Sequence, residues 1–108
     1  MTKMTDVYHL TLLPDTVEDA FMAFARQGFA LAAVTRAGTI THQHLLKQHG
    51  DQHEPRRFLW IVHWTLHYEL DVLEEIPRSL WKVAQRLDAM AETTAFARYV
   101  QQAEFVPV

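Results

Sequence analysis

The stretch Arg57-Phe-Leu-Trp-Ile-Val-His-Trp64 decides the fold, together with the broken helical run that follows it. Its β-branched and aromatic residues are typical of a strand, and the strand ends at Trp64. Behind it, residues 68–75 form a short helical piece. Pro77 suits the first turn of a new helix, because that turn leaves the backbone N–H unused and proline has none. The pattern predicts a strand followed by a helix in two parts.

Two further strands are predicted on the N-terminal side of this stretch. Residues 7–13 combine valine, tyrosine, threonine and leucine before Pro14 stops them, and both faces of this strand are largely apolar. Gly38 breaks the chain, and residues 39–47 form the next strand, which a turn-rich connection joins to residues 57–64. We expect these last two strands to make an antiparallel hairpin and the first strand to be covered on both faces.

Two helices are predicted, one before the hairpin and one after it. The first is capped by Asp15 or Thr16, with Glu18 or Asp19 as the partner in a capping box, and continues to about Val34. Apolar residues recur at helical spacing in both helices, which predicts one inward stripe for each. The first stripe is Val17, Phe21, Phe24, Gly28 and Leu31, and the second is Leu80, Val83, Ala84, Leu87 and Met90. An alternative is that the first helix ends at its glycine.

The C-terminal part completes the order of elements. Thr93 and Thr94 loosen the second helix, and Val100 to Val106 forms a last, short strand. The order β-α-β-β-α-β predicts a single α+β domain over residues 1–108, with a ferredoxin-like antiparallel sheet. Helices cover one face of such a sheet. The apolar side chains on the other face therefore predict a second copy of the chain as their cover, and hence a homodimer.

Composition and charge narrow the classes of partner. The 108 residues carry a formal net charge of -3, so nucleic acid is not an expected partner. The chain has no cysteine, which excludes disulfides, thiolate nucleophiles and iron–sulfur sites. The first residues lack the apolar core of a signal peptide, and no apolar run reaches the roughly 18 residues of a membrane helix. We expect a cytoplasmic protein without a membrane partner.

The chain resembles the dimeric α+β barrel superfamily, and within it the antibiotic-biosynthesis-monooxygenase-like group of small proteins. The resemblance covers nearly the whole chain by element order. It rests on Val62-His-Trp64 at the end of the third strand, on the helix broken through Pro77 and Leu80, and on Gly38 at the start of the second strand. The superfamily includes cofactor-free quinone-forming monooxygenases, haem-degrading enzymes, isomerases and proteins without known activity, so membership alone does not assign a function.

Haem degradation is not expected. The haem-degrading branch resembles this chain but carries an asparagine on the first strand and a tryptophan and a histidine on the second helix. The chain has no asparagine, Tyr8 occupies the corresponding strand position, and no histidine follows His67. The two helix positions fall near Glu74 and Ala84, where neither of the required residue types is present.

Three histidines form the first candidate site. His42 and His44 share one face of their strand, because side chains alternate with a period of two, and His63 joins them if the register of the hairpin allows. Three converging imidazoles suit zinc, copper or non-haem iron. The alternative is that these histidines are hydrogen-bonded residues of the sheet or of an interface, since a His-x-His pair is a frequent chance match.

An aromatic face forms the second candidate site. Trp60 and Trp64 share a strand face, and with Tyr8 they are predicted to wall an apolar pocket between the sheet and the helices. His44 or His67 is the predicted acid or base, since a histidine titrates near neutral pH and can deprotonate a phenolic substrate. The alternative is that the tryptophans belong to the core or to the dimer interface.

The leading hypothesis for function is a monooxygenase-like homodimer that binds or oxidises a small aromatic or polyketide-type molecule without a cofactor. No nucleotide-binding, flavin, nicotinamide or serine-hydrolase motif is present to suggest another route. A non-catalytic ligand-binding or stress-response homodimer is the first alternative. A protein that binds a metal through His42, His44 and His63 is the second.

Overall fold

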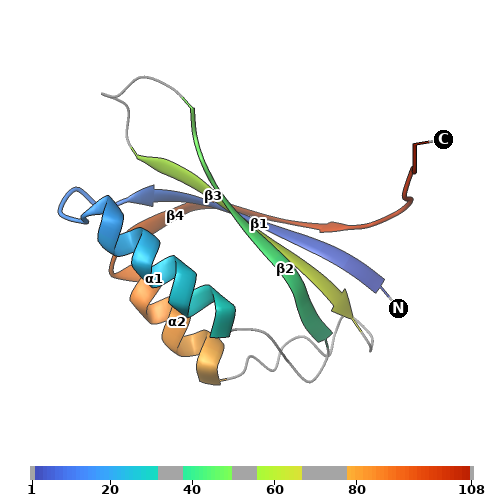
Figure 1. The fold of residues 1–108 in the computed structure, drawn as a ribbon, viewed down its shortest axis with the longest axis horizontal. Helices are drawn as coiled ribbons and strands as arrows, with labels where there is room; N and C mark the ends of the chain where they lie inside the picture. Colours follow the sequence, from blue (N-terminus) through green and yellow to red (C-terminus); the bar gives the residue numbers. More distant parts are fainter. Residues whose placement is uncertain (1, 32–37, 50–55, 67–77, 108) are drawn as a thin grey trace.

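The computed structural model describes residues 2–31, 38–49, 56–66 and 78–107. The elements are β1 (Thr2–Leu12), α1 (Glu18–Leu31), β2 (Gly38–Lys47), β3 (Arg57–Leu66), α2 (Arg78–Asp88) and β4 (Ala91–Val100). Their order confirms the predicted β-α-β-β-α-β sequence of strands and helices (Figure 1).

The four strands form one antiparallel sheet in the order β2-β3-β1-β4. The central strands are β1 and β3, and their register places Tyr8 opposite Trp60. On its other side β1 pairs with β4, where Tyr8 lies opposite Phe96. Both helices lie on the same side of the sheet, which is the ferredoxin-like arrangement (Figure 1). We name the covered side the helix face and the opposite side the open face.

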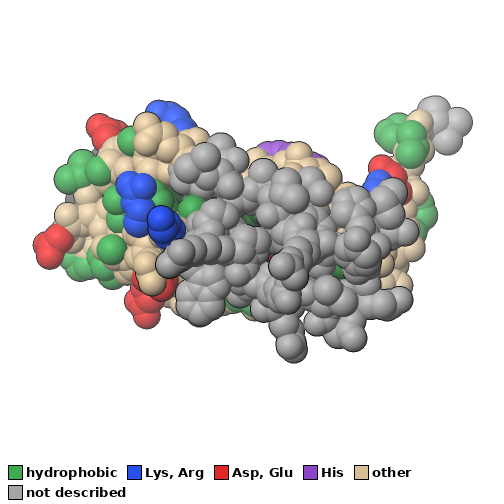
Figure 2. All heavy atoms as spheres, turned by 90° about the horizontal axis from the view of Figure 1, so that it is seen from below, with side chains coloured by type: hydrophobic (Ala, Val, Ile, Leu, Met, Phe, Trp, Pro, Cys, Tyr) green, Lys and Arg blue, Asp and Glu red, His purple; other side chains and the backbone are tan. Residues whose placement is uncertain are grey.

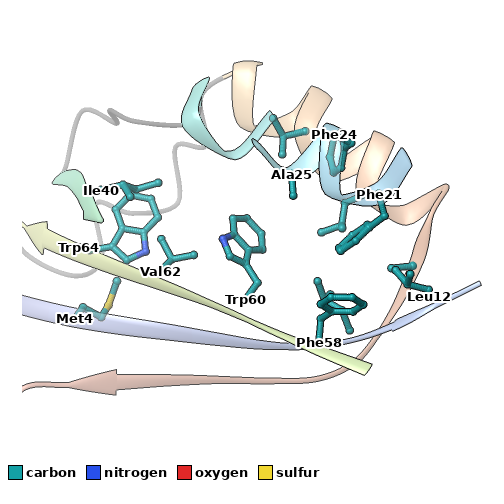
Figure 3. Packing of buried hydrophobic residues seen from close by; sticks show 14 of the residues in the cluster. Met4, Leu12, Phe21, Phe24, Ala25, Ile40, Phe58, Trp60, Val62 and Trp64 are labelled. Carbon is teal, nitrogen blue, oxygen red and sulfur yellow. The ribbon is translucent and has the colours of Figure 1, made fainter. Parts of the chain in front are cut away.

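The hydrophobic core lies between the helix face and the two helices (Figure 3). Alternation along β3 sends every second side chain to this face. The buried residues of β3 are Phe58, Trp60, Val62, Trp64 and Leu66. Phe21 and Phe24 of α1, and Val83 and Leu87 of α2, are buried above them, as the predicted stripes require. Phe21 has no exposed surface, and its ring centre lies 5.1 Å from that of Phe58.

The start of α1 differs from the predicted capping box. The carbonyl of Val17 accepts the first helical bond, from the N–H of Phe21, so Val17 is the N-cap instead of Asp15 or Thr16. Val17 is also 64% exposed and does not belong to the inward stripe. The Thr16 hydroxyl donates to the Met90 carbonyl oxygen at 2.7 Å. It therefore ties the start of α1 to the turn between α2 and β4.

The last strand lies earlier in the chain than predicted. It covers Ala91–Val100, whereas the sequence suggested Val100 to Val106. The β-branched pair Thr93-Thr94, predicted to loosen a helix, lies inside this strand, where its residue type is favoured. Beyond β4 the chain extends away from the domain as a tail in which Phe105 is 93% exposed (Figure 1).

The remaining predictions for the helices have mixed outcomes. Ala84 is exposed, so Val83 and Leu87 form the inward stripe among the described side chains of α2. The predicted helical piece at 68–75 and the predicted end of the first helix at 32–34 lie outside the described residues. Neither α1 nor α2 is long and apolar enough to cross a membrane, and no other helix occurs in the described ranges.

Candidate functional site

A buried carboxylate marks the candidate site on the helix face. Asp6 of β1 has no exposed surface, and the burial of a charge is costly unless the charge is paired. The Trp64 indole donates from Nε1 to Asp6 Oδ2 at 3.1 Å. Arg98 of β4 donates from Nε to Oδ1 at 2.8 Å and from Nη2 to Oδ2 at 3.0 Å. This bidentate, charge-assisted pair holds the guanidinium in a fixed position.

The sheet register explains why these residues meet. Asp6 lies directly opposite Arg98 in the pairing of β1 with β4. In the pairing of β1 with β3 it lies opposite Val62, two residues from Trp64. Side chains in direct or diagonal register on one face are within reach of each other. Three neighbouring strands therefore each supply one member of the network.

Tyr8 lies beside this ion pair and is enclosed by aromatic rings. Its ring stacks on Trp60 with centres 4.7 Å apart, and the centre of the Phe96 ring lies 4.8 Å away. Burial and, second, the negative charge of Asp6 raise the pKa of Tyr8 to about 12, although the positive charge of Arg98 acts in the other direction. The Tyr8 hydroxyl is therefore protonated near neutral pH and can donate a hydrogen bond.

The site is most exposed along β4, at the edge of the sheet. We name Asp6, Tyr8, Trp64, Phe96 and Arg98 the Asp6 cluster. Within it Asp6 is fully buried and Tyr8 is half-buried, whereas Phe96 is 48% exposed and the Arg98 side chain 43%. The guanidinium carbon of Arg98 lies 5.6 Å from the centre of the Phe96 ring, and the hydrogen bonds to Asp6 raise the pKa of Arg98. A ligand at this edge meets a fixed cation beside aromatic rings.

The predicted aromatic residues come together on the helix face, but His44 does not join them. Tyr8, Trp60 and Trp64 share this face, and the two tryptophans are 6% and 9% exposed. Figure 3 shows both tryptophans extending from β3 toward the side of the helices. His44 lies on the open face, so the sheet separates it from them. His67 lies outside the described residues, and the catalytic roles predicted for the two histidines stay predictions.

Asp6 and Arg98 were not among the site residues predicted from the sequence. The predicted first strand began at Val7, but β1 begins at Thr2, so Asp6 fell outside the predicted strand. A signal was present, since Asp6 shares its phase along β1 with the buried Leu10, and a charged residue in an inward phase needs a partner. Arg98 fell between the predicted second helix and the predicted last strand.

A hollow of about 570 Å³ lies away from the Asp6 cluster, near the C-terminal ends of β1 and β2. Its lining includes His9, Thr11, Leu46 and Leu59, and no member of the Asp6 cluster contributes to it. Seen from the side of the helices, the described surface mixes hydrophobic and charged side chains, and histidine side chains are visible at the upper rim (Figure 2). The hollow and the Asp6 cluster are therefore separate regions of the molecule.

No protein-family model matches the chain, and no curated protein matches it. Among solved structures, the chain is similar to the crystal structure of SnoaB, a cofactor-independent oxygenase from Streptomyces nogalater. The TM-score is 0.63 at 16% sequence identity, and the match covers 98% of this chain and 97% of SnoaB. This likeness confirms the ferredoxin-like β-α-β-β-α-β fold predicted from the sequence. At this level of identity it shows the fold alone.

Proposed function

We propose that this protein is a cofactor-independent oxygenase that acts on a small phenolic aromatic molecule at the Asp6 cluster. The observation that carries the proposal is the fully buried Asp6 carboxylate, which fixes a partly exposed Arg98 beside the phenol of Tyr8. Apolar residues of similar volume often stabilise a core as well as a buried ion pair does, so the pair favours a role in a site. The likeness in fold to SnoaB supports the same class of chemistry.

An aromatic substrate matches the side chains at the exposed end of the cluster. Phe96 and Tyr8 present neighbouring rings, and Phe96 is nearly half exposed. Offset and tilted contacts between aromatic rings contribute binding free energy beyond that expected from the apolar area they bury. Because these rings lie toward β4, at the edge of the sheet, a ligand can reach them without entering the core beneath α1.

Arg98 is the residue proposed to activate the substrate. A cation beside a phenol lowers the pKa of that phenol, since it stabilises the phenolate. The two hydrogen bonds from Arg98 to Asp6 hold this charge in place before the substrate arrives, which is the condition for effective electrostatic stabilisation. The phenolate is more electron-rich than the phenol and is the form that reacts with dioxygen.

The proposed reaction needs no external reductant. The phenol releases its proton to solvent water, and the phenolate adds dioxygen at a ring carbon that carries hydrogen. Loss of water from the resulting hydroperoxide, which takes up one proton, leaves a quinone carbonyl. One oxygen atom enters the product, the other leaves as water, and the substrate supplies all the electrons. Tyr8, protonated because its pKa is about 12, is the proposed donor of a proton to the departing oxygen.

The test combines dioxygen uptake with mass spectrometry of products formed under ¹⁸O₂, for a panel of polycyclic phenols. We expect the wild-type chain to consume one dioxygen per quinone and to place one labelled atom in it. Arg98→Lys keeps the charge but loses the bidentate fork, and should lower kcat/KM by about 10²–10³-fold. The matched control is Arg57→Lys, an exposed arginine outside the Asp6 cluster, which should keep the wild-type rate.

Two results would count against the proposal. If no phenol of the panel is oxidised while some of them quench the tryptophan fluorescence on binding, the protein binds ligands and is not an oxygenase. If a substrate is found and Arg98→Lys oxidises it at the wild-type rate, the reaction takes place away from the Asp6 cluster.

We further propose that the active form is a homodimer whose copies meet across the open faces of their sheets. Leu59 and Ile61 of β3 are only half-buried in a single chain, and Leu46 of β2 is 49% exposed. Leu46 lies directly opposite Leu59 in the sheet, so these apolar side chains are neighbours on one face. Exposed apolar surface of this kind is typical of an interaction site, and a second copy of the same surface is the simplest partner.

A further inference from the structure

Three histidines gather on the open face, where the proposed oxygenase chemistry makes no use of them. The rings of His42 and His63 stack with their centres 4.0 Å apart, and the ring of His44 stands edge-on to both, at 5.3 and 5.5 Å. One nitrogen from each ring lies within 4.8 Å of the other two. In a single chain His42 and His44 are exposed and His63 is half-buried.

A β-bulge creates this arrangement. The register of β2 against β3 pairs Ile40 with Trp64 but His42 with His63, so Thr41 is an extra residue in β2. Without it, Ile40 and His42 would point to the same face of the sheet. With it, Ile40 is buried on the helix face while His42 joins His63 on the other. Bulges re-aim side chains in this way and are frequent next to functional sites.

Threonine hydroxyls hold two of the rings. Thr41 Oγ1 donates to the carbonyl oxygen of His63 at 3.2 Å and lies 3.1 Å from His42 Nδ1. A hydroxyl has a single proton, so Thr41 accepts from His42, which places a hydrogen on Nδ1 and leaves the lone pair of Nε2 free for a metal. Thr5 Oγ1 lies 3.1 Å from His63 Nδ1 and anchors the second ring. Hydrogen bonds to the non-ligating nitrogen are typical of histidines that bind metals.

We propose that His42, His44 and His63 bind one divalent transition-metal ion, for which zinc is the probe of choice. All three donors are imidazole nitrogens, a set that suits zinc, copper and nickel and does not suit magnesium or calcium. Three protein ligands leave the fourth position of a tetrahedral zinc ion to water. The site lies across the sheet from the Asp6 cluster, on the face through which the proposed dimer forms, and the proposed oxygenase chemistry does not use it.

The geometry needs only a small adjustment to hold the ion. At Zn–N distances of about 2.0–2.1 Å, two nitrogens on a tetrahedral zinc lie about 3.3 Å apart. The present separations, within 4.8 Å, close to that value through side-chain rotations of His42 and His44, which are exposed.

The test is equilibrium dialysis of the purified, chelator-treated full chain against micromolar Zn²⁺, with metal analysis of the protein. We expect one zinc ion per chain. His42→Gln, His44→Gln and His63→Gln should each weaken binding by more than about a hundredfold, since loss of a partner that merely orients a ligand costs about 10–100-fold. Thr41→Val should fall within that smaller range. His9→Gln, an exposed histidine of β1 outside the cluster, should bind zinc like the wild type.

Circular dichroism spectra establish that each variant is folded. His42→Gln and His44→Gln change exposed side chains, so the test does not depend on the half-buried His63 alone. The proposal is overturned if the wild-type chain takes up no zinc under these conditions. It is equally overturned if the His42 and His44 variants bind as much zinc as the wild type, or if His9→Gln loses as much as they do.

Discussion

The two faces of the sheet are built from the same strands, yet they differ sharply in what covers them. On β3, Phe58, Trp60 and Val62 point to the helix face and are at most 6% exposed. Their neighbours Leu59 and Ile61 are also apolar but point to the open face, where they are only half-buried. Over residues 58–62 the strand is apolar in both phases. The cover, not the residue type, therefore decides which side chains form the core of a single chain.

The polar groups of the two faces differ in the same way. On the helix face the Asp6 carboxylate is satisfied within the chain, by Trp64 and Arg98. On the open face His42 and His44 are exposed to solvent. A buried, internally paired group presents a fixed electrostatic field to a ligand, whereas an exposed cluster of donors can reorganise around an ion. This contrast is why we propose organic chemistry on one face and metal binding on the other.

The largest expected effect is the loss of core packing on the helix face. Phe21→Ala removes a ring with no exposed surface and should lower the free energy of unfolding by about 3–5 kcal/mol. Leu46→Ala on the open face, at 49% exposure, should lower it by less than about 1 kcal/mol. Urea unfolding at a dilution at which the chain is a monomer measures both values. Equal losses there would show that Leu46 is packed as tightly as Phe21 within a single chain.

The next effect concerns the buried ion pair. Asp6→Leu leaves Arg98 without its partner and should cost roughly 2–4 kcal/mol, below the 3–5 kcal/mol of a fully buried pair because Arg98 is 43% exposed. The double variant Asp6→Leu/Arg98→Leu removes both charges and should be more stable than Asp6→Leu alone. Urea unfolding of the wild type, the two single variants and the double variant gives the coupling energy. Strict additivity would mean that the pair is not coupled in solution.

The smallest effect on stability is the alkaline titration of Tyr8. Its folded pKa of about 12 lies above the ordinary tyrosine pKa of 10.0, so the unfolded chain loses this proton first as the pH rises. The contribution of the Tyr8 phenol to the free energy of unfolding is fully present below about pH 10. It declines by roughly 1–2 kcal/mol as the pH rises through about 12. Tyr8→Phe should remove that part of the decline, whereas Tyr99→Phe, at 60% exposure, should not. Denaturant unfolding from pH 8 to 12 is the measurement; identical curves for the wild type and Tyr8→Phe would refute the burial of this phenol.

Local patterns predicted the order of elements and the faces of β3, because alternation and helical spacing are properties of neighbouring residues. The Asp6–Arg98 pair was missed because it joins strands at opposite ends of the chain, and the sequence gives no register for that pairing. The same limit applied to the histidines. Their shared face depended on the register against His63, which the bulge at Thr41 sets.

The position of β4 shows a different limit. Residues 91–100 are compatible with a continued helix or with a strand. The β-branched pair Thr93-Thr94 fits a strand better. Pairing with β1 favours the strand. The backbone N–H and C=O groups on the edge of β1 that faces away from β3 find hydrogen-bond partners in β4, where Tyr8 lies opposite Phe96. Such a gain is invisible in a local window of sequence.

The most direct test of the contrast between the faces is the mass of the protein in solution, measured by light scattering at micromolar concentration. If a second copy covers the open face, the wild-type chain will have twice the 12.6 kDa of one chain. Ile61→Asp, which places a charge on that face, will then have the mass of one chain, because an unpaired charge in an interface is costly. A wild-type mass of 12.6 kDa would contradict the proposed dimer and leave the open face to solvent.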